Sequence, residues 1–453
     1  MFTLLRSWWQ DRLLRGVVKN SSYLFSSTTV AAALTMLQGI FAARLLGVEV
    51  FGILSAAIPF VSNVNRLLSF RMSELVVKYL SQYLVEDERE KGAAVVKLTG
   101  LVEMVTSIAS YGVLVLIAPL GARYILKDVQ TQPLIVAFGV YLLAHTVYET
   151  SLGVMQVHKM FDRLALINLV QSILTAGMIF GAYLMRMGLR EVLLAYLAGK
   201  IFLGLATTVL ALRQMRRSFG RGWWRTSLDG LPPLRELARF AVSTNLQVTV
   251  NLVVRDSEIL LISFLRTPAE AGYFKIALGL INLVMMPIDP MIAPTYAEIS
   301  RAISEKMYAQ TRRLLKRVSL IAGVWTIGTG VVLALFGFWI IPLMYGSEYA
   351  PAAPALSILI IGYGFANIVH WNRPLLLALG MPDYSVKVSG AVGAVKTALS
   401  FLLVPAFGYL AEAAVLTVYF LASIGMVVQR GMRELHSRQH DAEAGLGVLE
   451  TLP

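Results

Sequence analysis

Cysteine is absent from the 453-residue sequence, and histidine occurs only five times. The absence of cysteine excludes disulfides, thiolate nucleophiles and metal sites with cysteine ligands. Charged residues are also scarce: they make up 15% of the chain, whereas soluble domains contain about a quarter. Apolar residues reach 57%, and the mean hydropathy is +0.67. This composition excludes an ordinary soluble protein and favours an integral membrane protein.

Apolar runs long enough to cross a bilayer recur along the chain, and a spanning helix needs roughly 20 mostly apolar residues. They predict an all-α polytopic membrane protein with twelve transmembrane helices. The expected spans of the first half are residues 21–43, 50–70, 95–119, 133–155, 163–185 and 191–212. Those of the second half are residues 236–263, 272–294, 318–344, 354–379, 384–404 and 410–429.

Most of the 40 Lys and Arg fall on the termini and on alternate loops between these spans. Because cytoplasmic loops carry an excess of positive charge, this pattern predicts that both termini are cytoplasmic. The expected organisation is an interfacial segment (1–20), an N-terminal six-helix bundle (21–212), a basic cytoplasmic linker (213–235), a C-terminal six-helix bundle (236–430) and a polar cytoplasmic tail (431–453). We expect no nucleic-acid partner, since the basic residues lie mainly between apolar runs.

The two halves resemble each other at an offset of about 220 residues. Gly52 follows the first span and Gly272 the seventh, while Asp162 precedes the fifth and Asp383 the eleventh. Such repeats commonly build two bundles around a site near the middle of the membrane. We therefore expect two pseudo-symmetric bundles around a central cavity.

Charged and polar residues inside the spans are the candidate site, because a charge in the bilayer costs about 3 kcal/mol on insertion scales. Arginine and lysine suit an anionic, phosphate-bearing cargo. The candidate cations are Arg66, Arg255, Lys275, Lys396 and Arg373, and the candidate polar lining is Asn63, Gln247, Asn251, Asn282, Asn367, His370 and Trp371. The alternative is that some of these cations snorkel or pair with acidic side chains to fix helix packing.

A second group of residues is titratable and offers sites for a coupling ion. His145 and Glu149 lie four residues apart on the fourth span, and a histidine near a carboxylate can carry a proton. The alternative is a packed, mutually satisfied pair. The other coupling candidates are Asp256, Glu258 and Asp289; Glu103 and Glu412 fit either a packing or a functional role. No pattern of catalytic or metal-ligating residues occurs, so we expect neither an enzyme nor a metal site, and no cofactor.

Five segments carry a resemblance to a known family through their order and spacing. They are ARLLGVEVFG (43–52), RDSEILLISFLRTPAEAGYFKIALGL (255–280), LMYGSEYAPAAPALSILIIG (343–362), LLLALGMPDYSV (375–386) and FLLVPAFGYLAEAA (401–414). Together they resemble the polysaccharide and oligosaccharide (Wzx-type) flippases of the multidrug/oligosaccharidyl-lipid/polysaccharide (MOP) exporter superfamily. The chain departs from the family at Tyr409–Ala413, where the family usually places a second glycine, and this concerns packing at the start of the last span.

The resemblance implies a flippase that moves a polyprenyl-diphosphate-linked oligosaccharide from the cytoplasmic to the outer leaflet by alternating access, for cell-surface polysaccharide biosynthesis. It implies residence in the cytoplasmic (inner) membrane, and H⁺ or Na⁺ is the candidate coupling cation. By position in the cavity, Arg66, Arg255, Lys275 and Lys396 are the cations expected to hold the diphosphate.

Three alternatives remain at this point. Lipid II flippases of the superfamily usually have fourteen spans, whereas this chain is expected to have twelve. Multidrug antiporters have twelve, but their cargo is typically cationic and favours carboxylates over Arg and Lys. A membrane-embedded sugar polymerase or ligase usually needs a large outer loop, and the longest expected here is about a dozen residues.

Overall fold

The computed structural model describes residues 12–68, 72–228 and 231–450, with side chains except at 12–29, 234, 240–248, 251 and 441–450. Every regular element in these ranges is helical. The longer helices are α2 (Arg12–Leu68), α3 (Met72–Val85), α4 (Arg89–Leu120), α8 (Phe161–Leu184), α9 (Leu189–Phe219), α10 (Leu234–Arg255), α12 (Pro268–Met285), α13 (Ile292–Ser304), α14 (Tyr308–Tyr345), α15 (Ala352–Ile368), α17 (Pro382–Phe407) and α18 (Tyr409–Glu450). The shorter ones are α5 (Gln132–Gly139), α6 (Tyr141–Ala144), α7 (Tyr148–Val157), α11 (Glu258–Leu265) and α16 (Asn372–Ala378).

The chain divides into two compact units. One unit is residues 34–272, and the other is residues 1–33 together with 273–453. Helices α10 and α11, which correspond to the expected seventh span, belong to the first of these units. The bundle boundaries expected from the linker at 213–235 differ from this division and stay a prediction.

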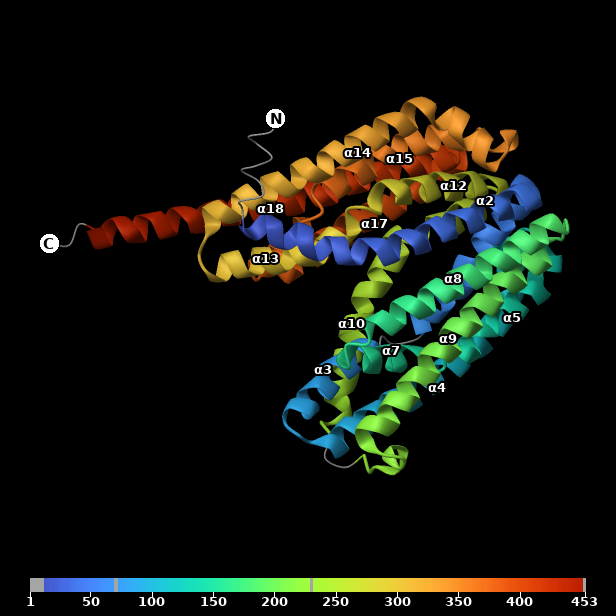
Figure 1. Ribbon diagram of the computed structural model, residues 1–453. Helices are drawn as coiled ribbons and strands as arrows, with labels where there is room; N and C mark the ends of the chain where they lie inside the picture. The colour runs from blue at the N-terminus through green and yellow to red at the C-terminus, as the bar shows by residue number, and fades with distance from the viewer. Residues whose placement is uncertain (1–11, 69–71, 229–230, 451–453) are drawn as a thin grey trace. The chain divides into compact units, whose positions relative to one another are not determined.

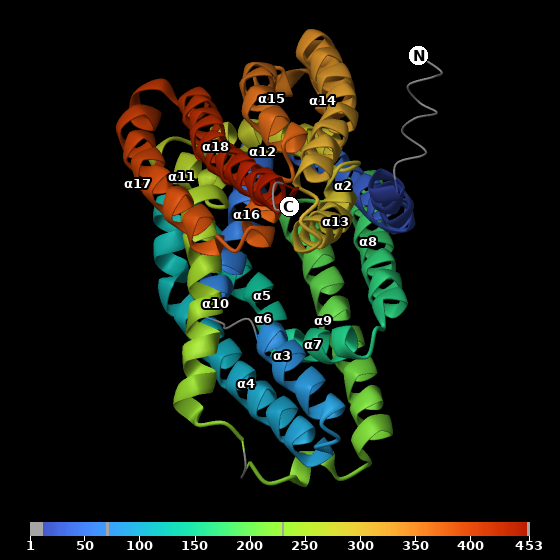
Figure 2. The same ribbon diagram turned by 90° about the vertical axis from the view of Figure 1, so that its left-hand side faces the viewer.

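In the unit of residues 34–272, α3 packs on α4 and α7, and α9 packs on α8, α7 and α5. Figure 2 shows α3 and α4 lying side by side. Buried apolar side chains of α3, α4, α7 and α9 form its core, among them Leu80, Val96, Met155 and Met215. Because these helices meet through small and apolar side chains, the few polar groups among them are held in defined positions.

In the other unit, α14, α15 and α18 lie side by side, and α17 packs on α18 (Figure 1). Its core contains Leu314 and Val318 of α14, Leu375 of α16 and Leu435 of α18. The outward side of α14 instead exposes large apolar residues, with 60% of Ile327 and of Leu335 accessible. A stripe of exposed aliphatic residues on a long helix is the expected surface toward lipid tails.

Nine helices of the described residues are long and apolar enough to cross a membrane, or ten if the pair Pro268–Met285 and Asp289–Ser304, bent by 47°, is one span. The all-helical, multi-spanning fold class is thereby confirmed. The nine include a single segment, Val30–Leu68, that covers most of both the first and the second expected spans. The structure is compatible with twelve spans, and that count stays a prediction.

Gly47 separates those first two spans. It adopts φ 70° and ψ 172° inside α2, so the two helical parts meet at a kink. A side chain at this φ clashes with the backbone, and glycine is therefore the residue that accommodates the kink.

The two glycines paired by the sequence repeat contact each other. A Cβ added at Gly52 would lie 1.8 Å from the carbonyl oxygen of Pro268, and one added at Gly272 would lie 3.3 Å from the Cα of Gly52. The backbone of α2 and the start of α12 therefore approach more closely than any side chain permits.

Candidate functional site

The candidate site is built on an interruption between α10 and α11. Asp256 and Ser257 have φ near −110° and ψ below 10°, so the helix stops at Arg255 and restarts at Glu258. The Ser257 hydroxyl donates to the carbonyl of Leu252 at 2.7 Å. Asp and Ser compete for backbone groups in this way and disfavour a continuous helix.

This interruption corrects one expectation. The spacing of Gln247, Asn251, Arg255 and Glu258 predicts one polar stripe along a continuous seventh span. In the structure the stripe ends at the interruption, because Arg255 is exposed whereas Glu258 is buried at the start of α11. The side chains of Gln247 and Asn251 lie outside the described residues.

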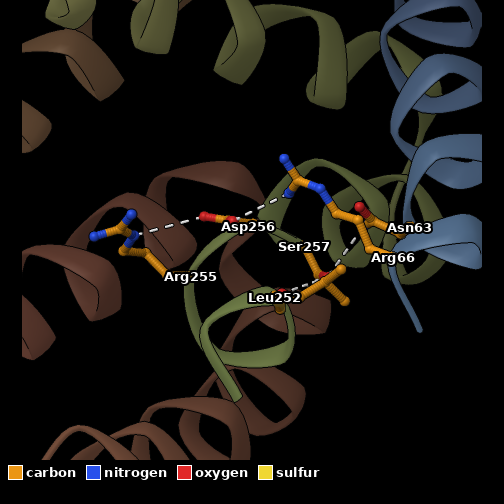
Figure 3. A network of polar contacts seen from close by, with 6 residues as sticks. All are labelled: Asn63, Arg66, Leu252, Arg255, Asp256 and Ser257. Carbon is orange, nitrogen blue, oxygen red and sulfur yellow. Dashed lines mark hydrogen bonds and ion pairs between the residues drawn. The ribbon is translucent and has the colours of Figure 1, made fainter. Parts of the chain in front are cut away.

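Asp256 lies between two arginines (Figure 3). Its Oδ2 is 3.3 Å from Nη1 of Arg66, and its Oδ1 is 3.5 Å from Nε of Arg255. Arg66 comes from α2 and is 190 residues away in sequence. Two guanidinium charges against one carboxylate leave a net charge of +1. All three side chains are partly exposed, with accessible fractions of 52% for Arg66, 53% for Arg255 and 36% for Asp256.

Asn63 attaches α2 to the same interruption. It is buried, and its amide donates to the Ser257 hydroxyl at 3.4 Å (Figure 3). Because Asn63 and Arg66 lie one turn apart on α2, they contact adjacent residues of the interruption. The structure thus brings together four sequence-predicted residues: Asn63, Arg66, Arg255 and Asp256.

Each guanidinium carries five N–H donors in a planar fork, and Asp256 engages one nitrogen of each arginine. The remaining donors are geometrically suited to the oxygens of a phosphate or diphosphate. A partly exposed, net positive cluster at a helix interruption is also a typical ion site in membrane transporters. The chemistry of the cluster therefore favours an anionic ligand.

Lys200 of α9 adds positive charge near this cluster, since it interacts electrostatically with Arg66. Its backbone carbonyl accepts a hydrogen bond from Nε2 of His145 at 2.8 Å. Lys200 was not among the sequence candidates, although the rule that finds Arg66, a charge inside an apolar span, also applies to it.

The fourth expected span is divided into α5, α6 and α7, so His145 and Glu149 do not share one continuous helix. His145 is engaged with Lys200, while Glu149 accepts a hydrogen bond from the Ser73 hydroxyl at 2.5 Å. Glu103 of α4 accepts the backbone N–H groups of Glu149 and Thr150 at 2.7 and 2.8 Å. A carboxylate at the first turn of α7 satisfies N–H groups that have no partner within the helix.

In the unit of residues 273–453, Lys396 lies away from solvent. Its Nζ is 2.5 Å from Oε1 of Glu412, and the two side chains are 4% and 0% exposed. Two other candidates of this unit are also buried: the Asn367 amide donates to Thr326 at 2.8 Å, and the Trp371 indole donates to Ser319 at 2.6 Å. These contacts join helices within the unit.

Other candidates of this unit are exposed. Lys275, Asn282 and Asp289, spaced by seven residues, all have accessible side chains, as does Arg373. His370 is buried, and its Nδ1 lies 3.2 Å from the carbonyl oxygen of Asn367. The three residues spaced by seven are therefore all exposed, whereas Asn367, His370 and Trp371 are buried within the packed helices of the unit.

A family profile described as polysaccharide biosynthesis protein matches residues 41–354. This chain belongs to that family. It is similar to the inner membrane protein YghQ of Escherichia coli, at 22% identity over 77% of this chain and 98% of the relative. The matched range includes the part of α2 that follows residue 40, all of α10 and the interruption after Arg255, so the arginine cluster lies inside the family region.

Two solved transporter structures have the same fold as this polysaccharide biosynthesis protein. An inward-facing multidrug resistance MATE transporter of the MOP superfamily matches with a TM-score of 0.75 and 13% identity, covering 94% of this chain and 98% of that one. The lipid II flippase MurJ, in an inward closed conformation, matches with a TM-score of 0.71 and 14% identity, covering 95% and 93%. The family match confirms the expected resemblance, and the solved structures show that the chain has the fold of MOP superfamily transporters.

Proposed function

We propose that this protein is a flippase for a polyprenyl-diphosphate-linked oligosaccharide, carrying it from the cytoplasmic to the outer leaflet of the inner membrane by alternating access. The family match to polysaccharide biosynthesis proteins supports a sugar-bearing cargo, and the MOP fold supports translocation. The predicted topology has both termini in the cytoplasm.

The observation that carries the proposal is Asp256 between Arg66 and Arg255. In the proposed mechanism the two arginines hold the diphosphate of the cargo and lower the cost of moving its charged headgroup, while the polyprenyl chain stays in the bilayer. Asp256 occupies the anion site when no cargo is bound. A proton or Na⁺ that neutralises Asp256 releases both arginines, which makes Asp256 the candidate coupling residue.

In the proposal, the cations of the unit of residues 273–453 have different roles. Lys275 and Arg373 are exposed and remain candidates for cargo binding from the sequence. Lys396 is assigned to packing because Glu412 already compensates its charge inside the unit.

A lipid II flippase and a multidrug antiporter are the alternatives within the superfamily, and the fold is shared with both. The arginine cluster favours a diphosphate over a cationic drug, because like charges repel. The arginine cluster does not by itself distinguish a polyprenyl-diphosphate oligosaccharide from lipid II, so the experiment compares these two lipids directly.

The test uses the full-length protein reconstituted in vesicles and follows the accessibility of three labelled cargoes: a polyprenyl-diphosphate oligosaccharide, lipid II and a cationic dye. We expect faster translocation of the oligosaccharide lipid than of either other cargo. Replacement of both arginines, Arg66→Gln with Arg255→Gln, should slow it at least about tenfold, since a charge-assisted hydrogen bond contributes about 1.5–3 kcal/mol.

The matched control is Arg213→Gln, which removes an exposed cation of α9 outside the cluster. It should translocate at the wild-type rate. Faster movement of lipid II or of the dye would assign the protein to the corresponding alternative. An arginine double variant as fast as the wild type would refute the role of the cluster.

A further inference from the structure

A groove on the unit of residues 273–453 lies among α14, α15 and α18, which run side by side (Figure 1). It has a volume of about 890 Å³. Its wall contains Leu320 and Ile327 of α14, Ile368 of α15, and Val428 and Met432 of α18. The groove belongs to one unit and contains none of the arginines of the candidate site.

One end of the groove is cationic. Arg312 and Lys316 lie one turn apart on α14, and both side chains are exposed. Neither forms an ion pair with another residue in the described parts of the chain. They belong to the segment TRRLLKR, residues 311–317, whose positive charge predicts the cytoplasmic end of this span.

The apolar part of the groove has the depth of one lipid leaflet. It follows α14 from Leu320 to Gly328, a rise of about 12 Å at 1.5 Å per residue. Half of the hydrocarbon core of a bilayer is about 15 Å. The groove therefore matches a chain that stays within one leaflet better than a polyprenyl chain, which is longer.

Two glycines keep the floor of the groove open. A Cβ added at Gly323 or at Gly328 would meet no heavy atom within 4 Å. Space is thus available directly against the backbone of α14. The Trp371 indole and the Ser319 hydroxyl, which also line the groove, are hydrogen-bonded to each other and leave that part of the wall effectively apolar.

We propose that this groove is a binding site for an anionic glycerophospholipid of the cytoplasmic leaflet. The phosphate contacts Arg312 and Lys316, and one acyl chain occupies the groove from Leu320 to Gly328. Basic pockets between transmembrane helices on the cytoplasmic side bind anionic headgroups in this way. The proposal is independent of the cargo, because it concerns a resident lipid and different residues.

The test is native mass spectrometry of the full-length protein released from nanodiscs that contain equal amounts of phosphatidylglycerol and phosphatidylcholine with identical acyl chains. We expect wild-type protein to retain one phosphatidylglycerol in preference to phosphatidylcholine. The variant Arg312→Gln with Lys316→Gln should lose about 30-fold in that preference, since each basic residue near an anionic surface contributes about 1 kcal/mol.

The matched control is Arg313→Gln with Arg433→Gln, which removes two exposed cations of the same unit that do not line the groove. It should retain the wild-type preference. Gly328→Leu fills the apolar part and should reduce retention of both lipids, and its open surroundings permit folding. Equal loss in the double variant and the control, no preference in wild type, or displacement of the lipid by inorganic phosphate alone would each overturn the proposal.

Discussion

The ion pair of Lys396 and Glu412 allows a test that distinguishes a structural role of Lys396 from a role in binding cargo. Nζ and Oε1 are 2.5 Å apart, and the side chains are 4% and 0% exposed. Removing one partner of a buried pair leaves an uncompensated charge and costs about 3–5 kcal/mol. Replacing both partners by apolar residues of similar volume is neutral or stabilising by about 1–4 kcal/mol.

We therefore expect Glu412→Gln to lower the free energy of unfolding by about 3–5 kcal/mol. The double variant Lys396→Met with Glu412→Leu should be at least as stable as wild type. The control is Arg430→Gln, because its pair with Glu434 is 3.7 Å long and exposed to 48% and 24%. Such an exposed pair contributes below about 1 kcal/mol.

The assay is reversible unfolding of the purified protein in mixed micelles, with translocation measured in parallel on each variant. If Glu412→Gln lowers the free energy of unfolding no more than Arg430→Gln does, the free energy assigned to the buried pair is wrong. If the double variant is stable but no longer translocates, Lys396 belongs to the cargo site, as the sequence predicted, and its assignment to packing fails.

Three further predictions concern the unit of residues 34–272. Asp256→Asn removes the carboxylate that competes with the cargo for the arginines. It should raise the affinity for a polyprenyl-diphosphate lipid, measured by calorimetry, up to about fivefold, since a partly exposed pair contributes up to about 1 kcal/mol. Unchanged or weaker binding would contradict the blocking role of Asp256. Glu103→Gln removes the charged cap of α7 and should lower the free energy of unfolding by about 0.5–2 kcal/mol. An unaltered unfolding midpoint would contradict the capping role of Glu103. Gly52→Ala places a Cβ 1.8 Å from the Pro268 carbonyl oxygen and should lower the free energy of unfolding by about 1–3 kcal/mol or more. Gly39→Ala, whose added Cβ has nothing within 4 Å, should be tolerated in the same unfolding assay. Equal effects of the two variants would refute the close approach.

The sequence by itself determined the membrane residence, the helical class and most span positions, because these follow from composition and from local periodicity. Gly47, where a positive φ is observed, lies between the expected spans 21–43 and 50–70. Charged and polar side chains inside apolar runs identified Asn63, Arg66, Arg255 and Asp256 as unusual without reference to any partner.

Only the tertiary structure decided which of these residues meet. Asp256 lies between an arginine next to it in sequence and another 190 residues away, and no local pattern specifies the second contact. The interruption after Arg255 also escaped the periodic pattern, because helical spacing continues formally through residues that fold otherwise. Lys396 and Lys275 look alike in sequence as single cations in apolar spans, yet one is buried against Glu412 and the other is exposed. Burial depends on packing between helices distant in sequence, which fixes whether a charge is compensated within the fold or left for a ligand.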